Sequence, residues 1–332
     1  MKIRITGHAG EAVFPFGLEG PWKQFEKVIE ERGHLICRKD FSEGADAIIA
    51  NSFDSNVRNF ISNSRIPKSR RILVLWEPYI VEKTRYQPRV LDLFGTVFAP
   101  SIDWAERVSG QAFPWPQDNF SDETIFNDWS SRINRVVVIQ GNKFSATKGE
   151  LYSARRRVLK SLNENELSLF GTNWNKGMKF DWWHWSRSLK NTSLREFSLK
   201  SSYGIGRKYC QYGGGVSDKT ETLRKFQISL VIENSPDFIS EKLFDSVRSG
   251  CVTIYLGPSL EKYGLSSESA IEVSNNPKKI AELVQSLIKI SNSERRVLAV
   301  KQFRALQPSL QDWNNYEVLS SMAQKMLAII EN

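Results

Sequence analysis

Residues 225–257 have the pattern of a strand, a short helix and a second strand, and this pattern constrains the fold more than any other part of the chain. Apolar residues recur at every second position over 226–232, which predicts a strand with a buried face. The apolar spacing then becomes helical, with Ser240 as N-cap and Gly250 just after the last turn. A second buried strand follows over 251–256. Because crossovers between parallel strands are right-handed, the polar residues after the first strand lie at the carboxyl end of a parallel sheet, where ligands bind.

Two polar triplets follow the first strand: Glu233-Asn234-Ser235 at its end, and Ser240-Glu241-Lys242 at the start of the helix. The free backbone N–H groups of a helix start attract anions, and here a hydroxyl, a carboxylate and an ammonium group lie beside them. The sequence therefore indicates a site for an anionic ligand. The alternative is that Glu241 only complements the helix dipole and that Lys242 is a solvated residue of the first turn, since charged first turns are common.

The order of these residues resembles the signature of the α-1,3/4-fucosyltransferase family, glycosyltransferase family 10. The residues that carry the resemblance are Glu233-Asn234-Ser235, Phe238, Ser240-Glu241-Lys242 and the run Gly-Cys-Val-Thr-Ile-Tyr-Leu-Gly at 250–257. Three residues depart from the family pattern: Ser240 replaces Thr, Phe238 replaces Tyr and Thr253 replaces Pro. These departures bear on the donor sugar more than on the fold.

The resemblance implies an inverting glycosyltransferase that moves L-fucose from GDP-fucose to a hydroxyl of a glycan acceptor, one that contains N-acetylglucosamine or a related sugar. Arg155, seven residues before Leu162, corresponds to the family arginine that holds the donor phosphates, a role that suits a guanidinium. Arg156 and Lys148 are the alternatives for it. The donor-binding residues that the resemblance implies are Arg155, Glu233, Asn234, Phe238, Ser240, Glu241 and Lys242. No cofactor beyond the nucleotide sugar is expected.

Glu77 is the candidate catalytic base. It directly follows an apolar strand predicted over 72–76, and the family has an acidic element after a comparable strand that contains Trp. The resemblance implies that its carboxylate removes the proton of the acceptor hydroxyl. The alternative is that Glu77 only caps the turn before Pro78, in which case Glu82 is the next carboxylate to consider.

The length of 332 residues and the alternation of predicted strands and helices indicate two α/β domains. A proline-rich passage suggests a boundary that gives an acceptor-side domain over 1–130 and a nucleotide-sugar-binding domain over 131–332. Two Rossmann-like domains that face each other across a cleft form the GT-B architecture, which the resemblance also implies. The sequence contains no Asp-x-Asp triplet, so no metal site is expected and protein cations must offset the diphosphate charge.

The net charge of +9 admits a nucleic acid, an anionic membrane surface or an anionic small substrate as partner. No nucleic-acid-binding motif accompanies the charge, so we expect no nucleic acid. Two rivals stay open: a GT-B transferase that uses another nucleotide sugar, and a non-catalytic protein that binds nucleic acid or an anionic surface. Salt-dependent polynucleotide binding without turnover would support the second rival.

The chain lacks an apolar run of about 18 residues and the apolar core of a signal peptide, so we expect a cytoplasmic protein, peripheral to a membrane at most. Cys37, Cys210 and Cys251 have no paired spacing and are expected to be buried thiols. The aromatic run at 180–185 can stack on a sugar or guanine, although such residues more often close a core.

Overall fold

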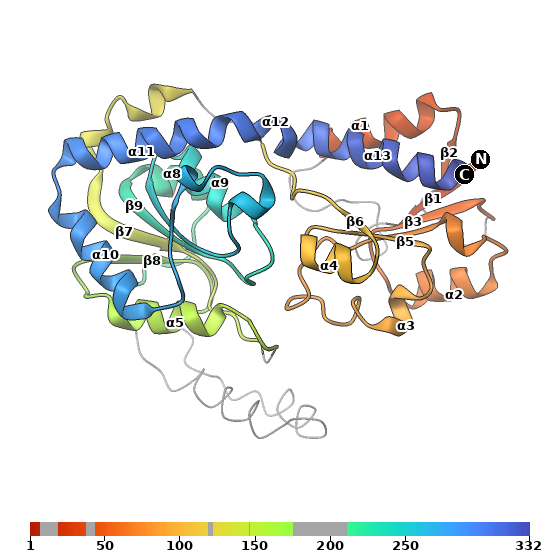
Figure 1. Cartoon of the computed structure of the whole chain (residues 1–332), viewed down its shortest axis with the longest axis horizontal. Coiled ribbons are helices and arrows are strands. Elements are labelled where there is room, and N and C mark those ends of the chain that lie inside the picture. The colour runs from red at the N-terminus through yellow and green to blue at the C-terminus, as the bar shows by residue number, and fades with distance from the viewer. Residues whose placement is uncertain (7–18, 38–43, 119–121, 146, 175–210) are drawn as a thin grey trace, which may run out of the picture. The chain divides into compact units, whose positions relative to one another are not determined.

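The computed structural model describes residues 1–6, 19–37, 44–118, 122–145, 147–174 and 211–332. The chain divides into two compact units. Unit 1 comprises Met1–Phe120, Asp237–Ile239 and Pro308–Asn332, and unit 2 comprises Ser121–Pro236 and Ser240–Gln307. Each unit contains its own parallel sheet with helices on both faces, as the alternating sequence pattern predicted (Figure 1).

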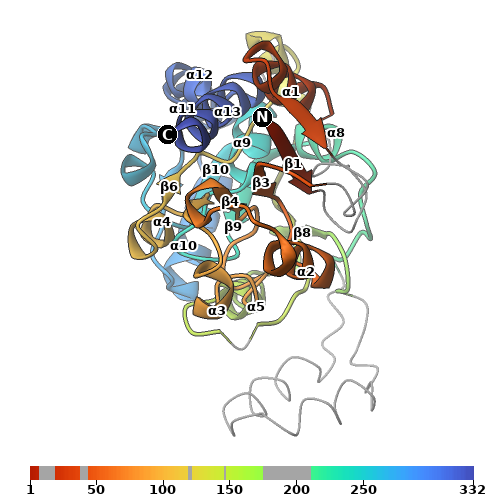
Figure 2. The same cartoon turned by 90° about the vertical axis from the view of Figure 1, so that its right-hand side faces the viewer.

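The described part of unit 1 contains a six-stranded parallel sheet in the order β2-β1-β3-β4-β5-β6. Its strands are β1 (Lys2–Thr6), β2 (Leu35–Cys37), β3 (Ala47–Ala50), β4 (Arg71–Val74), β5 (Thr96–Ala99) and β6 (Gln111–Ala112). Its helices are α1 (Glu19–Glu31), α2 (Ser55–Asn63), α3 (Pro88–Leu91), α4 (Ile102–Arg107), α12 (Leu310–Trp313) and α13 (Asn315–Glu331). Helices α1 and α13 cover one face of the sheet, while α2, α3 and α4 cover the other (Figure 2).

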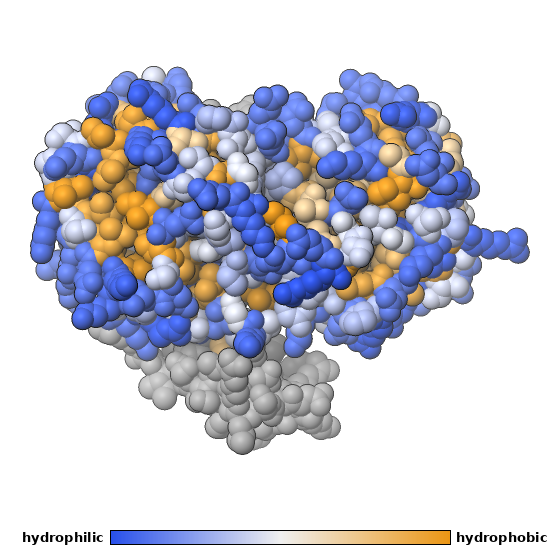
Figure 3. Space-filling view, viewed as in Figure 1, coloured by the Kyte–Doolittle hydropathy of each residue, from blue (hydrophilic) through white to orange (hydrophobic). Residues whose placement is uncertain are grey.

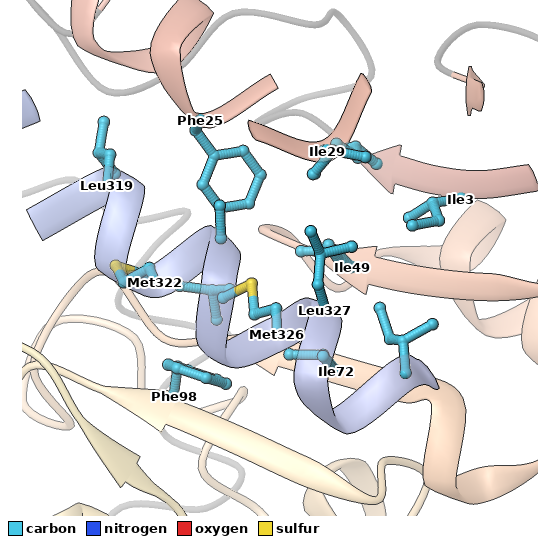
Figure 4. Packing of buried hydrophobic residues seen from close by; sticks show 14 of the residues in the cluster. Ile3, Phe25, Ile29, Ile49, Ile72, Phe98, Leu319, Met322, Met326 and Leu327 are labelled. Atoms are coloured by element: carbon cyan, nitrogen blue, oxygen red, sulfur yellow. The ribbon is translucent and has the colours of Figure 1, made fainter. Parts of the chain in front are cut away.

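Helix α13 packs in unit 1, although the sequence assigned the whole of 131–332 to the second domain. Its apolar stripe forms one core with α1 and with the near face of the sheet. Figure 4 shows how the stripe meets these elements, with labelled residues Leu319, Met322, Met326 and Leu327 of α13, Phe25 and Ile29 of α1, and Ile49, Ile72 and Phe98 of the sheet. The chain therefore returns to unit 1 because this stripe buries its apolar surface there.

The described part of unit 2 contains a five-stranded parallel sheet in the order β11-β10-β9-β7-β8. Its strands are β7 (Ile133–Ile139), β8 (Leu167–Phe170), β9 (Phe226–Ile232), β10 (Val252–Leu256) and β11 (Ile271–Glu272). Its helices are α5 (Tyr152–Ser161), α8 (Lys219–Arg224), α9 (Glu241–Arg248), α10 (Pro277–Lys289) and α11 (Asn292–Leu306). Across the described parts of both units, short 3-10 helices occupy Lys68–Arg70, Glu123–Phe126, Trp129–Ser131, Glu261–Tyr263, Ser267–Ser269 and Gln307–Ser309.

The βαβ unit predicted at 225–257 is present, formed by β9, α9 and β10. The two strands pair in parallel, and all seven residues of β9 are buried. The Ser240 side chain caps α9 by accepting a hydrogen bond from the backbone N–H of Lys242. Gly250 ends the helix with φ +75°, a left-handed conformation that favours glycine. These features place the two polar triplets at the carboxyl end of β9 and the start of α9.

Hydrophilic residues cover much of the face shown in Figure 3, with hydrophobic residues exposed between them. Among the described residues, the large apolar side chains with high exposure include Leu35 and Val297, each 66% exposed. They lie on different elements, β2 and α11, and single exposed apolar residues are normal on a folded surface. None of the helices described here is long and apolar enough to cross a membrane.

Candidate functional site

The order of the unit 2 strands reverses at β7. Strand β8 lies on one side of β7 and β9 lies on the other, so the helices after β7 and β9 leave the sheet in different directions. Ligands of open α/β sheets bind outside the carboxyl ends of the strands at such a switch point. Here β7 leads to Gly141 and β9 leads to Glu233. The first polar triplet therefore lies where the topology favours a ligand.

Arg155 of α5 links the ends of these two strands. Its Nη1 donates to the carbonyl oxygen of Gly141 at 2.8 Å, and its Nη2 donates to that of Ile232 at 2.8 Å and to Oδ1 of Asn234 at 3.3 Å. The side chain is buried, and this burial lowers its pKa to about 10. The guanidinium thus holds the strand ends together with the donors that a phosphate would use. Its predicted contact with the donor phosphates stays a prediction.

Glu233 is fully buried at the carboxyl end of β9. Its Oε1 accepts a hydrogen bond from the backbone N–H of Ser240 at 3.0 Å, and its Oε2 accepts one from the Ser240 hydroxyl at 2.7 Å. Oε2 also lies 3.4 Å from Nζ of Lys242. The carboxylate therefore ties the strand end to the first turn of α9, across seven residues of chain.

Ser240 uses its whole hydrogen-bonding capacity within this cluster. Its hydroxyl donates to Glu233 and accepts from the backbone N–H of Lys242 at 3.3 Å and from Nζ of Lys242 at 2.8 Å. A hydroxyl offers one donor and two acceptor positions, so none remains for a ligand. A Thr hydroxyl can make the same contacts, which explains why Ser240 can replace the family Thr.

Lys242 lies between two carboxylates. Burial lowers its pKa, but Glu241 and Glu233 outweigh burial, and the pKa is raised above its usual value. The side chain is 17% exposed, and two of its three N–H donors bind Glu233 and Ser240. Within the described part of the chain, the third N–H donor of Lys242 is left to face a ligand. The sequence-based alternative of a solvated first-turn lysine is therefore wrong.

Glu241 is held from a second side by Lys219, the first residue of α8. Nζ of Lys219 lies 2.9 Å from Oε1 of Glu241 and 3.8 Å from Oδ2 of Asp245. Desolvation raises the pKa of Glu241, but Lys242 and Lys219 outweigh it and lower the pKa to about 2. Sequence reasoning gave Lys219 no role.

Asn234 and Phe238 lie on the segment between β9 and α9. The carbonyl oxygen of Asn234 accepts a hydrogen bond from the backbone N–H of Leu151 at 3.0 Å, so its backbone and its side chain both meet the α5 region. Phe238 is counted with unit 1, is 2% exposed and packs edge-to-face on Trp115 with ring centroids 5.6 Å apart. Its predicted contact with the donor stays a prediction.

Glu77 lies in unit 1, just beyond the end of β4. It is half-buried, and its carbonyl oxygen accepts a hydrogen bond from the Tyr86 hydroxyl at 2.7 Å. The preceding Trp76 is buried and donates to Oδ1 of Asn51 at 2.9 Å, which joins the ends of β3 and β4. This environment fixes the backbone at Glu77. The structure therefore positions the residue, while its role as base or as turn cap stays open.

Glu82, the second candidate carboxylate, forms an ion pair with Arg85 at 2.9 Å. Cys37 and Cys251 carry free thiols, the first half-buried and the second buried, and burial raises the pKa of Cys251 to about 12. Cys210 and the aromatic run at 180–185 lie outside the described residues.

Residues 173–325 match the family model described as glycosyltransferase family 10 (fucosyltransferase), C-terminal part. This region holds the cluster around Glu233, Ser240 and Lys242, so the match and the geometry meet in the same residues. The resemblance expected from the sequence is thereby confirmed.

A curated relative supports the same family. The chain is 30% identical over 97 residues to a putative fucosyltransferase-like protein of Arabidopsis thaliana, a match that covers 26% of this chain. The matched region is 19% of the length of that relative. The chain therefore corresponds to about a fifth of the relative that it matches.

Solved glycosyltransferase structures resemble the whole chain. An α1,3-fucosyltransferase matches 100% of this chain and 90% of its own with a TM-score of 0.58 at 14% identity. Alr3699/HepE of Anabaena, in complex with UDP and glucose, matches 99% of both chains with a TM-score of 0.56 at 9% identity. The β-glucosyltransferase of T4 phage matches 100% of both chains with a TM-score of 0.53 at 14% identity. At these identities the matches show the fold, and the predicted GT-B class is confirmed.

Proposed function

We propose that the protein transfers L-fucose from GDP-fucose to a hydroxyl of a glycan acceptor, with inversion at the transferred carbon. The observation that carries this proposal is the cluster of Glu233, Ser240 and Lys242, which combines the family signature with a strand-end position at the topological switch point of unit 2. A cluster of this kind can hold a nucleotide sugar by its charged phosphates.

The donor diphosphate would meet the start of α9. The remaining donor of Lys242 provides a hydrogen bond for its oxygens, and the partial positive charge at the start of the helix favours them. However, Glu233 and Glu241 already offset much of the positive charge around Lys242. Further cations are therefore needed for the leaving group, and we assign this role to Arg156, whose Nη1 donates to the Lys143 carbonyl oxygen at 2.7 Å, and to exposed Lys148.

On the acceptor side, we assign the general base to Glu77. Its carboxylate would take the proton of the acceptor hydroxyl while that oxygen forms a bond to the sugar carbon and the bond to GDP breaks. The transition state has oxocarbenium character, as in glycosidases. Neither step requires a metal ion, so turnover should persist when divalent metal is chelated.

The rival within the same class is transfer from a different nucleotide sugar. Phe238 favours this rival, because it lacks the phenol hydroxyl of the family Tyr and lies buried against Trp115. A hydrogen bond that discriminates one sugar from another cannot come from this ring.

A panel of nucleotide sugars tests the proposal. GDP-fucose, GDP-mannose, UDP-glucose and UDP-N-acetylglucosamine are compared for thermal stabilisation of the protein and for slow hydrolysis without acceptor. We expect GDP-fucose to give the largest stabilisation and the fastest release of its nucleotide, unchanged by EDTA. Preference for a UDP-sugar would favour the rival, and inhibition by EDTA would contradict metal independence.

A further inference from the structure

We propose that Glu233 is a positioning residue: its buried carboxylate holds the ammonium group of Lys242 and the hydroxyl of Ser240 so that Lys242 presents a charged N–H donor to the phosphates of the ligand. This inference rests on the proposed function only for the identity of that ligand. It differs from the sequence-based expectation, in which Glu233 contacts the donor itself.

The geometry excludes direct donor contact by Glu233 in the state described. The side chain is 0% exposed, and both carboxylate oxygens have partners within the protein. Gly257 packs closely against the Glu233 side chain, because a Cβ at this position would come within 2.9 Å of Cγ of Glu233 and 2.3 Å of the Tyr255 hydroxyl. Glu233 therefore acts on a ligand only through the groups that it binds.

Those groups belong to the first turn of α9, where a ligand can reach them. Oε2 of Glu233 receives the Ser240 hydroxyl at 2.7 Å and lies 3.4 Å from Nζ of Lys242, and Ser240 Oγ accepts from that same Nζ at 2.8 Å. The three side chains form a closed triangle. Its only exposed part is the lysine, at 17%, so the triangle fixes where the remaining N–H of Lys242 points.

The charge of Glu233 matters as much as its shape. The ionisable groups that act on Lys242 are Glu241 of its own helix, Glu233 at the end of β9 and Arg155 of α5. Burial and Arg155 favour a neutral lysine, while the two carboxylates favour a charged one. Replacing Glu233 with Gln keeps the size and the acceptor for the Ser240 N–H. It removes the negative charge that keeps Lys242 protonated, and its amide group can no longer accept from the Ser240 hydroxyl.

The test is the pH dependence of GDP binding to Glu233→Gln, measured by calorimetry as the ratio of variant to wild-type affinity. This ratio cancels the titration of the nucleotide itself. We expect the variant to bind about threefold to tenfold more weakly near pH 7.5 and at least about thirtyfold more weakly near pH 9.5, because its lysine loses charge as the pH rises. A ratio that stays constant with pH would overturn the proposal, since a purely structural loss has no reason to follow lysine titration.

Glu268→Gln is the matched control, because Glu268 forms an exposed ion pair with Lys301 at 2.8 Å in the same unit. Its affinity ratio should stay near one at both pH values. A double-mutant cycle adds an independent test: in a Lys242→Met background, Glu233→Gln should weaken GDP binding by less than about twofold. Full additivity of the two changes would contradict a role that acts through Lys242.

If Glu233→Gln does not fold, Ser240→Ala and Ser240→Thr replace it. Ser240→Ala removes one corner of the triangle but keeps both carboxylates, so it should weaken GDP binding by a similar factor at both pH values, whereas Ser240→Thr should keep wild-type affinity. Equal GDP affinities of these two variants would also overturn the proposal. Failure of the proposed function looks different, because wild-type protein would then prefer UDP over GDP, and the same pH comparison would be made with UDP.

Discussion

Arg155 is the residue whose predicted and observed surroundings differ most. The family resemblance predicts a phosphate ligand, whereas the structure binds its guanidinium to the carbonyl oxygens of Gly141 and Ile232. Residue type and spacing give the position of an arginine along the chain but not whether its side chain points toward solvent or inward. The direction of the Arg155 side chain depends on which carbonyl oxygens the fold leaves without a backbone partner. The sequence does not show this, because the two strand ends come together only in the folded protein.

Arg155→Lys tests the bridging role. A lysine keeps the positive charge but cannot donate to two carbonyl oxygens in the fixed geometry of a guanidinium. We expect the free energy of unfolding to fall by about 1–3 kcal/mol and turnover to fall with it. Urea denaturation and an initial-rate assay measure the two effects. Arg157→Lys, at an exposed position of the same helix, is the control. Wild-type stability and rate in Arg155→Lys would contradict the bridge.

Glu77→Gln tests the assignment of the catalytic base. The change keeps the shape of the side chain but removes its ability to accept a proton, so transfer should fall by about 10²–10⁴-fold, the usual contribution of general-base catalysis. Donor affinity should hold near the wild-type value. If Glu77 only caps the turn before Pro78, the rate should stay within about threefold of wild type, and Glu82→Gln would be the next variant to assay.

The helices and strands with strong periodicity were predictable, and those without it were not. Strand β9 has the bounds expected from its alternating apolar residues, and the N-cap of α9 is Ser240 as predicted. Helix α11 was missed, because its apolar residues do not form one stripe: Arg295 and Gln302 are buried while Val297 is exposed. Its capping box of Ser291 and Glu294 was the signal in the sequence that could have identified it.

Helix α8 was also missed, and with it the position of Lys219. The helix has six residues and a single buried side chain, Leu223, so no periodicity can reveal it. Lys219 lies 22 residues before Glu241 in the chain, and only the packing of α8 beside α9 brings the two together. Local patterns could predict the polar triplets of the site, but not the partners that come from neighbouring elements.

Lys219→Met tests the tie between α8 and α9. Lys219 contributes to lowering the pKa of Glu241 to about 2, so the ion pair stabilises the fold at pH values above the usual glutamate pKa and is lost as the pH falls toward 2. The side chain of Glu241 is 39% exposed, so solvent screens part of the effect. We expect the variant to melt a few degrees lower near neutral pH and this difference to shrink steadily below about pH 4.5. A difference that grows on acidification would contradict the assignment.

Helix α13, near the C-terminus, packs into the same hydrophobic core as elements from the N-terminal part of the chain. Helix α13 contributes Leu319, Met322 and Leu327 to the core of unit 1, which otherwise comes from the first part of the sequence. Sequence reasoning assigned this helix to the second domain together with the rest of 131–332, since an apolar stripe shows that a helix is buried without showing against what. The return of the chain to unit 1 is therefore a property of the assembled fold.

Leu327→Ala tests this arrangement. Leu327 is 1% exposed, and truncating a buried leucine costs about 2–5 kcal/mol of unfolding free energy. We expect unit 1 to unfold at a lower urea concentration. GDP affinity should stay unchanged, because the donor cluster lies in unit 2. Val297→Ala is the control, because this side chain of α11 is 66% exposed, and it should leave the transition in place. A loss of GDP affinity without a shift in urea would contradict the assignment of α13 to unit 1.

The fate of the fucosyl group tests the proposed transfer most directly. Wild-type protein is incubated with GDP-fucose that carries ¹³C in the sugar ring and with a mixture of glycans that contain N-acetylglucosamine, and the product is followed by NMR. We expect that GDP is released and that labelled fucose appears on a glycan hydroxyl with the anomeric configuration opposite to that of the donor. Retention of the donor configuration, or turnover of another nucleotide sugar with none of GDP-fucose, would contradict the proposed transfer.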